Sequence, residues 1–219
     1  SKEFNIPVIE DAAHALGSKF DGQYVGCNSD YTIFSLQAIK HMTTVDGGFL
    51  ALKSQENMDK ARIKRWFGLD KTKSRLENDI KETGYKYSMN NVNATIGLVQ
   101  MRFLRSVLDK YISNGKFYDN SLQNIDGLQL IPYYDTEPSY WLYTMKVDHR
   151  DDFVKMLESN EIMASPLHHR NDTHSLFSTS RRILPGLEDF YGKLVHIPCG
   201  WWVTEKDRLK IVDCIKNGW

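Results

Sequence analysis

Cysteine is scarce in this sequence, and long apolar runs are missing from it. Cys27, Cys199 and Cys214 lie far apart and in no paired spacing. An odd, scattered set argues against a disulfide framework and is typical of a reducing compartment, so we expect the protein in the cytoplasm. No apolar stretch approaches the roughly 18 to 20 residues that cross a bilayer, and we expect no membrane partner.

Net charge is also absent, because Lys plus Arg and Asp plus Glu both number 28 among the 219 residues. A balanced charge gives no general attraction to nucleic acid, so none is predicted as a partner. The histidines His168, His169 and His174 lack the cysteine and carboxylate spacing of a zinc site, and we predict no metal. The chain opens at Ser1 with neither an initiating Met nor a signal peptide, so we expect it to begin inside a domain.

Three short apolar runs, at residues 6–9, 31–35 and 48–52, predict three neighbouring strands. The first run ends in Glu10-Asp11 followed by small residues, as a buried parallel strand does where it feeds a loop. Residues 54–67 have apolar positions at helical spacing, and Gly68 is a plausible stop. The charged segment after it, residues 70–83, is expected to form a surface loop.

Apolar residues recur at helical spacing from Val92 to Tyr111, which predicts one amphipathic helix from about Asn91 to about Tyr118. A helix of that length often links two domains. Beyond Asn124 the pattern changes to strand-like and helix-like segments, at residues 127–132, 140–147, 150–159, 194–198 and 207–216. The sequence therefore predicts an α/β part with a long linking helix over residues 1–124 and a small α+β domain over residues 125–219.

Three chemical groups are expected to meet at the open edge of the first sheet. Asp11 follows one strand, Ser35 ends the next, and Lys40 comes five residues later; ligands bind at such an edge in parallel sheets. An amine for a Schiff base, a carboxylate for a pyridinium nitrogen and a hydroxyl for a phosphate oxygen together suit pyridoxal 5'-phosphate (PLP). Taken singly, the same residues have ordinary explanations, as a helix cap, a strand end and a solvated surface lysine.

The sequence around these groups resembles the DegT/DnrJ/EryC1/StrS sugar aminotransferases. The resemblance lies in Val8-Ile-Glu-Asp-Ala-Ala-His-Ala15, Phe34-Ser-Leu-Gln-Ala-Ile-Lys40 and Thr43-Thr-Val-Asp-Gly-Gly48, and continues in Gly84-Tyr-Lys-Tyr-Ser-Met89 and Ile197-Pro-Cys-Gly200. It implies the C-terminal part of a fold type I PLP-dependent transferase large domain, followed by the small domain. Family members begin well upstream, so the resemblance also implies an N-terminal truncation.

The resemblance assigns roles to four residues. Lys40 is the Schiff-base lysine and proton shuttle, Asp11 pairs with the pyridine nitrogen, and Ser35 binds the cofactor phosphate. His14 matches a position, often Gln in the family, that hydrogen-bonds the ring's phenolic oxygen.

Several positions depart from the family pattern. Val45-Asp46-Gly47-Gly48 stands where Gly-Glu-Gly-Gly is common. Lys86 and Ser88 replace the usual Asn and Arg of a block that reaches across the dimer. His168 and His169 replace a variable histidine-containing segment, and all four residues are assigned to substrate on this weaker ground.

The resemblance implies a homodimeric aminotransferase with shared active sites. The enzyme would move an amino group from an amino acid, glutamate by family resemblance, to a nucleotide-linked keto sugar in amino-sugar or polysaccharide biosynthesis. Two alternatives stay open. One is a PLP-dependent sugar dehydratase of the same family, against which Lys40 argues because those enzymes carry His there. The other is a non-catalytic binding or regulatory module on this fold.

Overall fold

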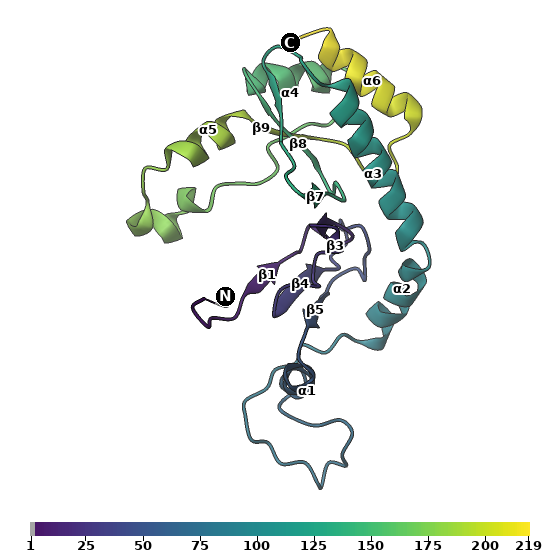
Figure 1. The fold of residues 1–219 in the computed structure, drawn as a ribbon, viewed down its shortest axis with the longest axis vertical. Helices are drawn as coiled ribbons and strands as arrows, with labels where there is room; N and C mark the ends of the chain where they lie inside the picture. Colours follow the sequence, from purple (N-terminus) through teal and green to yellow (C-terminus); the bar gives the residue numbers. More distant parts are fainter. Residues whose placement is uncertain (1–2) are drawn as a thin grey trace. The chain divides into compact units, whose positions relative to one another are not determined.

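The structure is a computed structural model that describes residues 3–219, and Figure 1 shows its helices and strands. The chain divides into two compact units. Unit 1 runs to Val107 and includes Asp135–Ser139, whereas unit 2 comprises Leu108–Tyr134 and Tyr140–Trp219. The sequence predicted a domain boundary after residue 124. The two units instead divide between Val107 and Leu108, inside the helix that was expected to link the domains. The expectation about how the chain begins concerns Ser1, which lies outside the described residues.

The main sheet of unit 1 has three strands in the order β1-β4-β5. β1 (Ile9–Asp11) runs parallel to β4 (Tyr31–Ser35), and β4 pairs antiparallel with β5 (Gly48–Leu52). All three expected strands are therefore present and adjacent, although the first begins later than residue 6.

The expected burial of the first strand is wrong. Ile9 is 72% exposed, and Ile33 and Leu50, which share its face through the strand register, are 40% and 41% exposed. The opposite face is better covered: Thr32 and Phe34 are buried there. Side chains alternate between the two faces of a strand, so an apolar run is buried along its whole length only where both faces are covered.

A second small sheet, in the order β3-β2-β7, brings a distant segment into unit 1. β2 (Lys19–Phe20) pairs antiparallel with β3 (Gln23–Tyr24) on one side and with β7 (Thr136–Glu137) on the other. Next to this sheet the buried hydroxyls of Ser18 and Ser139 lie 2.9 Å apart. Residues 135–139 thus belong to unit 1 although the sequence around them reads as part of the second domain.

Helix α1 (Gln55–Lys64) begins where the sequence predicted it, because the Ser54 side chain accepts a hydrogen bond from the backbone N–H of Asn57. It ends three residues earlier than expected. Trp66 already pairs with Lys86 as an isolated bridge, and Gly68 follows with a φ of +78°. Residues 70–83 form turns without a regular helix or strand, as predicted.

The single long helix expected from Asn91 to Tyr118 is two helices, α2 (Asn91–Met101) and α3 (Leu104–Ser121). The break lies at Arg102 and Phe103, whose N–H groups bond to carbonyls three residues back instead of four. This tighter turn ends the α-helical ladder. The apolar spacing continues across it, so the pattern gave no sign of the break.

Unit 2 is an antiparallel sheet of β6 (Leu128–Leu130), β8 (Tyr143–Val147) and β9 (Leu194–Ile197), in that order. Helices α4 (Arg150–Ser159) and α6 (Glu205–Lys216) pack on it, and Figure 1 shows α3 beside α6. The predicted capping box of α6 is confirmed between Thr204 and Asp207. Helix α5 (Pro185–Lys193) and the 3₁₀ turns Asn171–Thr173 and Ser175–Ser180 were not predicted.

The core of unit 2 is dense. Its fully buried side chains include Tyr118, Leu122, Met145, Val147, Phe153, Leu157, Val195 and Ile215. Burying one large apolar side chain contributes about 1.5 to 3 kcal/mol. Gly115 on α3 makes room for the ring of Tyr140, since an added Cβ would lie 2.3 Å from that ring.

Within residues 3–219, no helix has the combination of length and apolar character that a bilayer crossing needs.

Candidate active site

The strand register places the predicted acid and hydroxyl on one face of the main sheet. Asp11 is the last residue of β1 and lies beside Ile33 of β4; Ser35, the last residue of β4, is two positions further along. Residues two apart on a strand point to the same face, so Asp11 and Ser35 share it. Strand spacing and rise put their Cα atoms about 8 Å apart.

The neighbouring acids Glu10 and Asp11 point to opposite faces. Glu10 Oε2 accepts hydrogen bonds from Ser29 Oγ at 3.1 Å and from Thr32 Oγ1 at 3.2 Å, which ties this carboxylate into the fold. Asp11 Oδ1 accepts a local bond from the backbone N–H of Ala13 at 3.1 Å, and the residue is exposed. Asp11 is therefore the carboxylate that is available to a ligand.

Lys40 lies in a loop whose base is closed by backbone hydrogen bonds. Leu36 N donates to Gly47 O and Thr44 N donates to Leu36 O, both at 2.9 Å, and Lys40 N donates to Gln37 O at 3.0 Å. The return to β5 requires glycine at position 48, because a Cβ there would lie 2.4 Å from the carbonyl oxygen of Phe34. The loop thus holds the lysine backbone in a defined turn beyond the end of β4.

Partial burial lowers the pKa of Lys40, and the negative charge of Asp11 acts on it in the opposite direction. The amine and the carboxylate are thus close enough to interact through charge. A lowered pKa increases the fraction of neutral amine, which is the form that acts as a nucleophile or a base.

Two histidines complete the cluster. His14 is exposed in the turn after β1, whereas His41 is only 5% exposed, and its Nε2 lies 3.1 Å from the carbonyl oxygen of Ser139. Burial lowers the pKa of His41 to about 4; the backbone bond at Ser139 opposes this shift, and the charges of Lys40 and His14 add to it. His41 was not among the predicted site residues, although its position directly after Lys40 in the sequence could have indicated it.

These residues fit PLP by the chemistry of their side chains. One edge of unit 1 offers a carboxylate at Asp11, a hydroxyl at Ser35 and an amine of lowered pKa at Lys40. The cofactor needs these three groups for its ring nitrogen, its phosphate and its aldehyde carbon.

The structure does not bring the other predicted residues of unit 1 to this cluster. Lys86 bridges to Trp66, and the backbone N–H of Ser88 donates to Arg65 O at 3.1 Å. Both therefore lie beside the C-terminal end of α1, and their role in substrate binding stays a prediction.

The two predicted histidines of unit 2 lie in a separate aromatic cluster. The His168 ring is 5.3 Å from that of His196, in an edge-on arrangement. His169 has its Nε2 2.7 Å from Thr173 Oγ1 and its Nδ1 3.3 Å from the hydroxyl of Tyr191. Among residues 3–219, no group of three His, Cys, Asp or Glu side chains is arranged to hold a metal ion.

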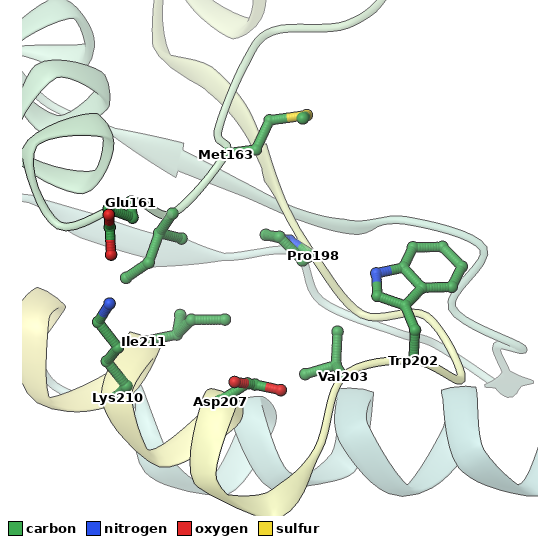
Figure 2. A pocket seen from close by; sticks show the side chains of 9 residues that line it. Glu161, Met163, Pro198, Trp202, Val203, Asp207, Lys210 and Ile211 are labelled. Carbon is green, nitrogen blue, oxygen red and sulfur yellow. The ribbon is translucent and has the colours of Figure 1, made fainter.

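Unit 2 also has a surface pocket of about 270 Å³ between the segment after α4 and helix α6. Figure 2 shows Trp202 at one end of it and Glu161 and Lys210 at the other. Its floor is apolar, with Ile211 among the lining residues. None of the predicted site residues lines this pocket.

Comparison with solved structures defines the class of the fold. AtS13 from Actinomadura melliaura has a TM-score of 0.94 at 40% sequence identity, over 97% of this chain and 58% of that one. The sugar aminotransferase CalS13 from Micromonospora echinospora has a TM-score of 0.93 at 36% identity, with the same coverage. The predicted α/β fold of a PLP-dependent transferase is confirmed.

The family follows from the sequence comparison. The model of the DegT/DnrJ/EryC1/StrS aminotransferase family matches residues 1–216, and the chain belongs to this family. A UDP-4-amino-4,6-dideoxy-N-acetyl-beta-L-altrosamine transaminase of Campylobacter jejuni is 30% identical over 230 residues, which cover 98% of this chain and 59% of the transaminase. The chain thus spans about three fifths of the length of these relatives.

Proposed function

We propose that this chain is part of a PLP-dependent aminotransferase that moves an amino group from an amino acid to a nucleotide-linked keto sugar. The observation that carries the proposal is the grouping of Asp11, Ser35 and Lys40 at one sheet edge, with Asp11 acting electrostatically on Lys40. Membership of a family of sugar aminotransferases supports it. The amino donor is glutamate in this proposal, and the product enters amino-sugar biosynthesis.

Four side chains would hold the cofactor. Lys40 Nζ would attach it covalently, and the Asp11 carboxylate would keep a proton on the ring nitrogen. Ser35 Oγ would donate a hydrogen bond to the phosphate, and His14 would donate one to the phenolic oxygen. When bound, PLP supplies a protonated ring that stabilises negative charge at the substrate carbon.

Lys40 would also move the proton. Partial burial keeps more of this amine neutral than at an exposed lysine, so it can accept a proton from the substrate carbon and return it to a neighbouring atom. The negative charge of Asp11, which also acts on Lys40, would favour the protonated ring nitrogen. The Lys40 amine and the Asp11 carboxylate thus have separate tasks at the same edge of the sheet. The amine moves the proton, and the carboxylate favours the protonated ring.

We propose a sugar carried on a nucleotide because related proteins are named as transaminases of UDP-linked amino sugars. Lys86 and Ser88 in unit 1 and His168 and His169 in unit 2 are the candidate residues for binding it. Substitution of each by Ala should raise KM for the sugar nucleotide more than KM for glutamate. Equal effects on both constants would remove that residue from the sugar site.

The proposed enzyme is a cytoplasmic homodimer with shared active sites. Cys27, Cys199 and Cys214 are free thiols, which supports a reducing compartment. The dimer rests on family membership and on the preference of homo-oligomers for two-fold symmetry. Light scattering of the full-length protein should give twice the protomer mass; a monomer would contradict the proposal.

The experiment that tests the function compares Lys40→Ala with Lys81→Ala in the full-length protein. Lys81 is an exposed lysine of the loop between α1 and α2. The wild type and Lys81→Ala should show visible absorbance that changes when glutamate is added, and Lys40→Ala should lose both the absorbance and turnover. Transamination by Lys40→Ala would contradict the proposal, and a wild type without such absorbance would favour a non-catalytic module.

A further inference from the structure

His41 is buried directly beside the proposed catalytic amine. Its ring is 5% exposed, and its Nε2 lies 3.1 Å from the backbone carbonyl oxygen of Ser139. A carbonyl oxygen only accepts hydrogen bonds, so Nε2 must carry the hydrogen and donate it. The imidazole therefore links the Lys40 loop to a segment almost a hundred residues away in the sequence.

The acceptor of this bond is itself held firmly. The backbone N–H of Ser139 donates to Ser18 Oγ at 3.0 Å, and the hydroxyls of the two serines are 2.9 Å apart. Both serines are buried, and they adjoin the pairing of β2 with β7. The carbonyl of Ser139 is thus held in place, and its hydrogen bond with His41 can fix the position of the loop.

The charges around His41 favour a neutral ring. Burial lowers the pKa of His41 to about 4, and the positive charges of Lys40 and His14 add to that effect. The backbone bond at Ser139 opposes it, and Asp11 acts on the neighbouring Lys40. At neutral pH the ring donates one hydrogen and adds no positive charge beside the amine.

The backbone hydrogen bonds of the loop close its base, whereas the His41 side chain connects its tip to another segment. Leu36 bonds to Gly47 and Thr44 bonds to Leu36, so these two bonds close the loop at its base. Lys40 lies between these points, near the tip, where the backbone bond to Gln37 is local. His41 is the neighbour of Lys40 that ties the tip to a different part of unit 1.

We propose that His41 is a positioning residue whose neutral imidazole, hydrogen-bonded to the Ser139 carbonyl, fixes the turn that presents the Lys40 amine to Asp11. The inference rests on the proposed function of Lys40. It concerns the placement of the amine and gives His41 no contact with substrate.

The test compares two substitutions at position 41. His41→Gln keeps an N–H donor that reaches the Ser139 carbonyl, whereas His41→Leu fills a similar volume without a donor. In cofactor-free protein, the extent of reductive dimethylation of Lys40 is measured against pH by mass spectrometry. Thermal unfolding of each variant is recorded in parallel.

We expect the Lys40 labelling profile of His41→Gln to match the wild type. In folded His41→Leu the profile should move to higher pH, toward that of an exposed lysine, because the amine is no longer held in its partly buried position. A purely structural role would lower the melting temperature of His41→Leu and leave the profile of the folded protein unchanged. That result, or equal shifts in both variants, would overturn the proposal.

If His41→Leu fails to fold, Ser18→Ala provides the second test. This substitution frees the Ser139 segment without touching the loop, and the Lys40 profile should move in the same direction by a smaller amount. An unchanged profile in folded Ser18→Ala would then overturn the inference. Labelling needs no cofactor, so its outcome is separate from the turnover of Lys40→Ala, which tests the proposed function.

Discussion

Glu10 and Asp11 are chemically similar neighbours whose side chains leave β1 in opposite directions. Glu10 is hydrogen-bonded to Ser29 and Thr32 on one face, whereas Asp11 shares the other face with Ser35. The alternation of side chains along a strand therefore separates a carboxylate bonded within the fold from the one proposed to bind the cofactor, within two residues.

Asp11→Asn should leave PLP bound and slow proton transfer by about 100-fold or more, because a neutral amide cannot hold a proton on the ring nitrogen. Single-turnover kinetics with glutamate measure this step. Asp21→Asn is the matched control, since Asp21 is exposed at a turn with a φ of +48°, where Asn is readily accommodated. Wild-type rates in Asp11→Asn would refute the assignment.

Val45 has a φ of +71°, an unfavourable value for a β-branched side chain, and is 58% exposed in the loop that carries Lys40. Val45→Asn should raise the free energy of unfolding by about 1 kcal/mol, because Asn tolerates this region far better. Denaturant titration measures the change. Val45→Ala removes the branch but keeps a Cβ without the local polar group of Asn, and it serves as the control. An equal gain there would mean that loss of the branched side chain, and not the tolerance of Asn for this region, is the cause.

At this scale the sequence predicted the residue types of the candidate site, because each carries a distinct chemistry at a strand end or in the following loop. It did not single out His41. The importance of this side chain comes from the Ser139 carbonyl, which only the pairing of β2 with β7 brings near it. A contact between segments so far apart leaves no pattern in the local sequence.

Among the elements, α3 is joined to the turn before α6 through the buried side chain of Asn114. Asn114 is 3% exposed, and its Nδ2 lies within 3.1 to 3.3 Å of the carbonyl oxygens of Cys199, Gly200 and Val203. Its Oδ1 faces the guanidinium of Arg208 at 3.4 Å. A single amide thus satisfies several backbone groups that are otherwise shielded from water.

Asn114→Leu should lower the free energy of unfolding by about 2 to 3 kcal/mol, because it leaves buried carbonyls without a donor. Asn120→Leu, at an exposed position of the same helix, is the control and should change the stability little. Denaturant unfolding of the two variants gives the comparison. A similar loss in both would mean that the hydrogen bonds of Asn114 are not responsible.

Element boundaries were predictable where a local signal exists. Ser54 caps a helix that begins where the sequence placed it. The capping box of Thr204 with Asp207 was also predicted, although α6 begins at Glu205, two residues earlier than expected. The break at Arg102 and Phe103 carries neither Gly nor Pro and keeps the apolar spacing, so nothing in the pattern indicated it. The backbone hydrogen bonds of Arg102 and Phe103 define this turn, and the apolar spacing does not report them.

Across the molecule, the two units bury their apolar residues differently. Unit 2 encloses a continuous core between its sheet and helices, whereas unit 1 leaves one face of its main sheet exposed at Ile9, Ile33 and Leu50. The sequence predicted an α/β part followed by an α+β part. It could not place residues 135–139 in unit 1, because a two-residue strand has no periodicity to detect.

The stability of the whole protein should depend on pH through His41. Its pKa is about 4 in the fold against an ordinary value of 6.5, so between these values the unfolded chain binds a proton that the folded chain does not bind. The free energy of unfolding should therefore fall as the pH falls from about 6.5 to about 4, by about 3 kcal/mol from this group.

Denaturant titrations of the wild type and His41→Gln at several pH values measure this effect. The substitution removes the titrating group, so the loss of stability between neutral and mildly acidic pH should be smaller in the variant. His174→Gln, at an exposed histidine, controls for the loss of an imidazole as such. Parallel pH curves for the wild type and His41→Gln would rule out this contribution.

The pairing of Asp11 with Ile33 has one more consequence. The register of two adjacent strands can change only in steps of one residue, each about 3.3 Å along the strand. Sliding β1 by a single step would turn the carboxylate to the far side of the sheet, and sliding it by two would keep the side but change the span to Ser35. The hydrogen-bond ladder of two short strands therefore sets the length of the molecule that fits between acid and hydroxyl.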